Sequence, residues 1–130
     1  VDGEQIEWLR GEMARRRPRG RLIVVTHVPL VSGVLQVVAD PWKSAETYLV
    51  KNAREVLEVL WPHEPRMVLQ GHTHIRERLT YRGCEFVTSG AVCGNWWKGA
   101  REGHPEGFGV VEVAGGQLVW RYETYGFRAR

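Results

Sequence analysis

Two short apolar runs decide the fold, Leu22-Ile-Val-Val-Thr26 and Met67-Val-Leu-Gln70, and each is followed directly by a histidine-bearing segment. Neither run alternates between apolar and polar residues, so both predict strands that are buried on both faces. Between them, residues 44–60 carry their apolar side chains at helical spacing, with charged side chains opposite. The order strand, helix, strand predicts a crossover connection between two parallel strands.

The flanking segments complete an α/β fold with a mixed sheet. Asp2 and Gln5 have the spacing of a capping box, which predicts an amphipathic helix before the first strand. Residues 27–43 contain two prolines and a glycine and predict a long loop. In the C-terminal half, apolar segments flank Arg82-Gly83 and Ala114-Gly115-Gly116, so we expect two antiparallel hairpins there.

Composition favours one domain that spans residues 1–130. With 43% hydrophobic and 25% charged residues, the chain can bury a core, which excludes disorder of the whole chain. No apolar run approaches the ~20 residues that cross a bilayer, and the start at Val1 lacks the pattern of a signal peptide, so we expect a cytoplasmic protein. The two cysteines, Cys84 and Cys93, have neither the number nor the spacing of a disulfide framework or a cysteine-rich zinc site.

The charge pattern argues against nucleic acid as the main partner. The formal net charge is only +3, although arginines concentrate between Arg15 and Arg21. No aromatic residue interrupts that run to stack on bases, so we interpret it as a solvated helix end. Binding of nucleic acid through the run remains the weakest of the hypotheses for function.

Three of the five histidines follow the predicted strands, His27 after the first and His72 and His74 after the second. Ligands of open α/β sheets collect at the carboxyl ends of parallel strands, and imidazole is a favoured ligand of zinc and similar ions. We therefore predict a metal site made by these three side chains. The alternative is that each histidine only donates a hydrogen bond to a backbone carbonyl and packs.

Gly71 lets the chain turn before His72, so His72 and His74 need not point the same way and could hold two neighbouring ions. The other histidines, His63 and His104, lie beside prolines, and we expect them to be ordinary surface residues.

The segments Leu22–Leu30, Val68–His74 and Thr88-Ser-Gly90 resemble the C-terminal half of the calcineurin-like metallophosphoesterase superfamily. With Gly94–Trp97 and Pro105–Gly109, the chain is most similar to the bacterial cyclic-nucleotide phosphodiesterase-like branch. The resemblance implies part of a four-layer α/β/β/α sandwich. It also implies a hydrolase that cleaves phosphoesters, with a phosphodiester or cyclic nucleotide as substrate, and with two divalent ions per intact site (Mn, Fe or Zn).

By the same resemblance, His27 and His72 would share one ion and His74 would hold its neighbour. The family's Asp-x-His, Gly-Asp and Gly-Asn-His motifs do not occur in this chain, whose only aspartates are Asp2 and Asp40. Without a bridging carboxylate, two adjacent dications would repel each other, so we expect weak or partial metal occupancy. We therefore assign no catalytic residue here and expect the chain to be inactive alone.

Two alternatives stay open. The chain could be a non-catalytic or truncated module that binds at most one loosely held ion. We also expect self-association if a sheet face that carries Leu118, Trp120 and Tyr122 lacks a cover. The roles of Trp96 and Trp97 are likewise open, because they could cover a substrate or pack beneath their glycine-rich loop. The cations of the same loop, Lys98 and Arg101, could meet phosphate or be solvated.

Overall fold

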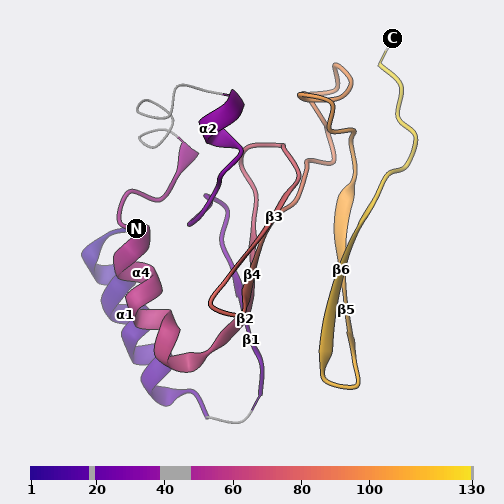
Figure 1. Cartoon of the computed structure of the whole chain (residues 1–130). Helices are drawn as coiled ribbons and strands as arrows, with labels where there is room; N and C mark the ends of the chain where they lie inside the picture. Colours follow the sequence, from indigo (N-terminus) through magenta and orange to yellow (C-terminus); the bar gives the residue numbers. More distant parts are fainter. Residues whose placement is uncertain (18–19, 39–47, 130) are drawn as a thin grey trace.

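The computed structural model describes residues 1–17, 20–38 and 48–129, which form helices, a four-stranded sheet and a separate hairpin (Figure 1). The helices are α1 (Gly3–Arg15), α2 (Leu35–Val38), α4 (Ala53–Leu60) and the 3-10 turn η1 (Trp61–His63). The strands are β1 (Leu22–Val25), β2 (Pro65–Gln70), β3 (Glu77–Tyr81), β4 (Cys84–Thr88), β5 (Phe108–Ala114) and β6 (Gln117–Glu123). Figure 1 shows α1 and α4 along one face of the four-stranded sheet and the β5–β6 hairpin on its other side.

The four-stranded sheet is mixed, with the order β1-β2-β4-β3. β1 and β4 both pair with β2 in parallel, whereas β3 pairs with β4 in the antiparallel direction. Arg82 (φ 53°) and Gly83 (φ 74°) make the tight turn between β3 and β4, a geometry that matches the right-handed twist of paired strands. The predicted α/β class, the parallel crossover and the antiparallel hairpins are therefore confirmed.

The core lies between the helices and the sheet. Leu60 of α4, Val68 of β2 and Phe86 of β4 are at most 1% exposed and belong to one apolar cluster, which Ile6 of α1 completes. The capping box that opens α1 is present, because the Gln5 N–H donates to Asp2 and the Asp2 N–H donates to the Gln5 side chain. The amphipathic spacing of both helices thus places their apolar sides on this core.

Burial of β1 differs from the prediction. Val25 is 76% exposed, so β1 is covered on its helix side only. β2, by contrast, buries Met67 on the side that faces away from the helices. An unbroken apolar run therefore does not fix two-sided burial by itself, because burial also requires an element that packs over each face.

Helix boundaries differ as well. Of the helix predicted over residues 44–60, α4 covers Ala53–Leu60; residues 49–52 before it are not helical, and Val50 there donates its N–H to the Pro29 carbonyl. The predicted loop over residues 27–43 contains the short helix α2. Residues 39–47, and with them Asp40, lie outside the described part of the chain.

A four-layer sandwich is not confirmed for the described residues, which form helices, a mixed sheet and an antiparallel hairpin. The predicted bare face of the hairpin needs correction, since Leu118, Trp120 and Tyr122 are half-buried, whereas Val119 on the opposite face is 51% exposed. Self-association itself stays a prediction.

None of the helices in the described ranges has the length and apolar character that crossing a bilayer requires.

Candidate functional site

The carboxyl ends of β1 and β2 bring His27 and His72 together. The parallel ladder continues past β1, since Thr26 donates to the Leu69 carbonyl and Gly71 donates to the His27 carbonyl at 2.9 Å each. His27 is thereby fixed beside the residue that precedes His72. Its Nε2 lies 3.2 Å from Nδ1 of His72, and the two rings meet edge to face with an interplanar angle of 74°.

The turn after β2 separates His72 from His74. Both histidines adopt left-handed backbone conformations, with φ of 70° and 61°. Thr73 between them is 2% exposed, and its N–H donates to the Gly71 carbonyl at 2.8 Å. As the glycine before them suggested, the two rings are aimed differently.

His74 belongs to a separate group of contacts. Its Nδ1 lies 2.8 Å from the carbonyl oxygen of Gly94, and because that oxygen can only accept, Nδ1 carries the proton. The lone pair of His74 is therefore on Nε2. The Trp96 ring packs 4.6 Å from the imidazole with a tilt of 36°, and the Cys93 sulfur lies 4.0 Å from Nδ1.

The three predicted ligands do not converge on one point. Within the described ranges, no group of three or more His, Cys, Asp or Glu side chains is arranged to hold an ion. Nδ1 of His72 and Nε2 of His27 lie within hydrogen-bond distance of each other; two ligands of one ion would be similarly spaced, because metal–nitrogen bonds of ~2.1 Å at angles of ~90–110° separate the nitrogens by ~3.0–3.4 Å. The observed 3.2 Å lies in that interval. An open depression of about 370 Å³ adjoins His27, lined by Val25 and Leu69.

Gln70 holds the loop that follows His27, a role that the sequence analysis did not assign. It is 4% exposed, and its carboxamide oxygen accepts the Leu30 N–H at 3.0 Å. Its amide nitrogen donates to the Val31 carbonyl at 2.5 Å and to the Thr88 hydroxyl at 2.9 Å. The available signal was a single polar residue at the end of an apolar strand, because a buried amide must find partners.

His104 is not the ordinary surface residue that we expected. Its Nδ1 accepts the Arg76 N–H at 3.4 Å, which ties the loop of His104 to the segment after His74. Burial, and then the positive charge of Arg76, lower the pKa of His104 below its usual value. The neutral ring that results can act as an acceptor.

Trp96 and Trp97 do not pack beneath their loop. They are 57% and 54% exposed, and both have left-handed backbones that the Trp97 N–H to Cys93 carbonyl bond helps to hold. Trp96 contacts His74, whereas the Trp97 ring lies 5.4 Å from that of Phe127. Only Trp96 is therefore part of the candidate site. His63, predicted at the surface, is half-buried and lines a separate depression that contains no other histidine, with Arg16, Arg21 and Arg66.

Comparison with known proteins corrects the family assignment. No family model and no curated protein matches the chain. A crystal structure of phosphopantetheinyl hydrolase from Mycobacterium tuberculosis is similar, with a TM-score of 0.51 and 20% identity over 67% of this chain and 30% of that chain. That protein is described as a phosphopantetheinyl hydrolase and not as a calcineurin-like metallophosphoesterase, so the membership implied by short motifs is wrong on this comparison. At 20% identity the likeness concerns the fold alone, and the chain spans less than a third of the length of that hydrolase.

Proposed function

We propose that the chain contributes part of a metal-dependent hydrolytic site that cleaves a phosphoester. His27 and His72 are the ligands of one divalent ion, and His74 is a ligand of a second, neighbouring ion. The observation that carries the proposal is the 3.2 Å approach of two imidazole nitrogens at the carboxyl ends of adjacent parallel strands. Because the matched solved hydrolase is much longer, the whole activity is proposed for a larger enzyme to which this chain belongs.

The chain's own residues would prepare the ligands. The Gly94 carbonyl keeps the proton of His74 on Nδ1 and so leaves Nε2 free to ligate, a common arrangement around metal-bound histidines. The strand ladder and Gln70 hold His27 in place beside His72. Divalent manganese, iron or zinc, when bound, would lower the pKa of a coordinated water and stabilise charge on phosphoryl oxygens.

The substrate class is a phosphoester, with phosphodiesters and cyclic nucleotides as the first candidates. The name of the similar solved structure adds phosphopantetheinyl compounds. Imidazole nitrogen ligates only when it is unprotonated, so metal affinity should fall as the pH is lowered.

Titration with Co²⁺, followed by its visible absorption, tests the ligand assignment without an activity assay. We expect His27→Ala and His72→Ala each to weaken the first ion by at least about tenfold, by analogy with the loss on perturbing metal ligands. The double variant should bind that ion more weakly than either single variant, because it removes both proposed ligands. His74→Ala should affect a different, weaker ion, and His63→Ala is the matched control that should change nothing.

Equal Co²⁺ affinity in the wild type and the His27→Ala, His72→Ala double variant would contradict the proposal. That result would favour the second candidate, a non-catalytic module. The observation behind this candidate is that the described residues place no third ligand around the His27–His72 pair. A chromogenic phosphodiester with added Mn²⁺ separates the two roles further. For this chain alone we expect little turnover, and any turnover that occurs should vanish with His27→Ala.

A further inference from the structure

We propose that Arg101 binds a phosphoryl group of the substrate, in a small hollow beside the histidines. This inference deepens the proposed function and rests on it for the identity of the substrate. The binding of an anion at Arg101 can nevertheless be measured without a metal.

The backbone of Arg101 is fixed by a tight turn. Arg101 and His104 exchange hydrogen bonds, N–H to carbonyl, at 2.9 and 2.7 Å. The two residues between them, Glu102 and Gly103, have φ of 47° and 79°, the combination that a two-residue hairpin turn requires. Because the His104 ring also accepts the Arg76 N–H, the turn is attached to the segment that carries the histidines.

The side chain of Arg101 is placed by Trp96. Its guanidinium carbon lies 4.9 Å from the centre of the Trp96 ring, a cation–π contact, and the same ring packs 4.6 Å from that of His74. One indole thus joins the cation to a proposed metal ligand.

The charge of Arg101 has no partner of opposite charge among the described residues. Its Nε is buried and has no acceptor among the described residues, and no carboxylate in the same ranges forms an ion pair with it. Because Nε is enclosed, an anion in the hollow would be met by the terminal nitrogens of the guanidinium, which form no ion pair with a carboxylate in the described ranges. The planar guanidinium fork matches phosphoryl oxygens better than an ammonium group does.

The hollow has the size and position for such a group. Its volume is about 110 Å³, whereas a single water needs roughly 10–15 Å³ in the same measure. Thr73, which lies between His72 and His74 in the chain, lines it together with Arg101 and Tyr48, whose ring is 5.7 Å from that of His72. Leu35, Ile75, Val38 and Glu102 complete the lining. A phosphoryl group bound there would lie beside Thr73 and Tyr48, the residues of the lining that connect the hollow to His72.

A variant of Glu102 should change phosphate affinity in the opposite sense to a variant of Arg101. Its carboxylate lines the same hollow and would repel a phosphoryl group, so removal of its charge should tighten binding. Arg101→Gln should weaken the binding of inorganic phosphate by at least about tenfold, and Glu102→Gln should tighten it several-fold, which are the usual sizes for one charge-assisted contact. Arg101→Lys should be intermediate, because it keeps the charge and loses the fork.

The experiment is a calorimetric titration of the metal-free chain with inorganic phosphate in EDTA at constant ionic strength. The control is Arg121→Gln, which removes an arginine from the β5–β6 hairpin and should leave phosphate affinity unchanged. Circular dichroism establishes that each variant is folded. An undetectable wild-type affinity, an unchanged Arg101→Gln affinity, or an equal loss in Arg121→Gln would each overturn the inference.

Failure here and failure of the metal proposal remain distinguishable. Arg101→Gln should leave Co²⁺ affinity intact, and His27→Ala should leave metal-free phosphate affinity intact. If phosphate binding depends on Arg101 while Co²⁺ binding does not depend on His27, the anion site stands and the metal assignment falls.

Discussion

The four-stranded sheet and the β5–β6 hairpin are both built from short apolar strands, but they are stabilised in different ways. In the sheet, β2 and β4 bury most of their residues, with Val68, Cys84 and Val87 fully enclosed. In the hairpin, no residue of either strand is buried. An isolated two-stranded hairpin is marginal in water, so the comparison teaches that the hairpin depends on how it docks to the rest of the chain.

The docking uses aromatic side chains laid over glycines. Within the hairpin, a Cβ added to Gly107 would clash with the Glu123 carbonyl oxygen and lie 2.7 Å from the Tyr122 ring. A Cβ on Gly90 would lie 2.4 Å from the Tyr122 hydroxyl, which donates to the Pro105 carbonyl at 2.9 Å. These close approaches replace the apolar burial that stabilises the sheet.

The largest expected effect comes from the core of the sheet. Phe86→Ala should lower the free energy of unfolding by about 3–5 kcal/mol, because it leaves a cavity among fully buried neighbours. Urea denaturation followed by circular dichroism measures it. The matched control is Phe108→Ala in the hairpin, where the ring is 47% exposed and the loss should be below about 1 kcal/mol. Equal losses would show that the hairpin is as tightly packed as the sheet.

The second effect should be confined to the hairpin. Gly107→Ala should cost about 1–3 kcal/mol, because the added carbon has no room beside Glu123 and Tyr122. Amide hydrogen exchange should then be faster in β5 and β6 and unchanged in β2 and β4. Gly3→Ala, where an added Cβ meets nothing within 4 Å, is the control and should not change exchange in either region. Faster exchange throughout the chain would mean that the two regions unfold together.

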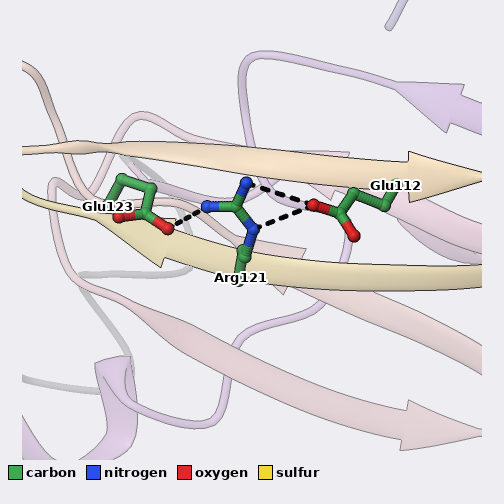
Figure 2. A network of polar contacts seen from close by, with 3 residues as sticks. All are labelled: Glu112, Arg121 and Glu123. Carbon is green, nitrogen blue, oxygen red and sulfur yellow. Dashed lines mark hydrogen bonds and ion pairs between the residues drawn. The ribbon is translucent and has the colours of Figure 1, made fainter.

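The smallest effect should come from the outer face of the hairpin. Figure 2 shows Arg121 between Glu112 and Glu123, and it approaches Glu112 through two nitrogens at 3.1 and 3.2 Å. The arginine side chain is 47% exposed, so solvent screens these ion pairs and Arg121→Gln should lower the melting temperature only slightly. Thermal unfolding at low and high salt measures the loss, which should shrink further as salt is added. A loss that salt does not change would indicate a packing role for the arginine stem.

Local patterns predicted the elements better than they predicted burial. The capping box of α1 and the turn at Arg82-Gly83 are local, because a few neighbouring residues satisfy each other's hydrogen bonds or backbone angles. The exposure of Val25 is not local, because it depends on what covers β1. Nor is the contact of the non-helical residues before α4, where Val50 donates its N–H to the Pro29 carbonyl.

For the candidate site, too, some features could be predicted from local sequence and others could not. The positions of His27, His72 and His74 after two parallel strands could be predicted, since parallel strands end at a common edge. Their separation into a pair and a third residue could not, because it depends on left-handed backbones at His72 and His74 and on the Gly94 carbonyl. The sequence placed Arg101 in a glycine-rich loop where a cation could meet phosphate, but it left a solvated surface charge as an equal alternative. Only the fold brings it over Trp96 and beside Thr73.

By itself, the sequence determined the α/β class, the parallel pairing of two strands and the edge at which three histidines gather, because these follow from periodicity, chain direction and local backbone chemistry. The tertiary structure decided which histidines meet, which strand faces remain exposed and which cation lies next to the site. Those properties arise from contacts between residues far apart in the chain, whose free energies no single stretch of sequence contains.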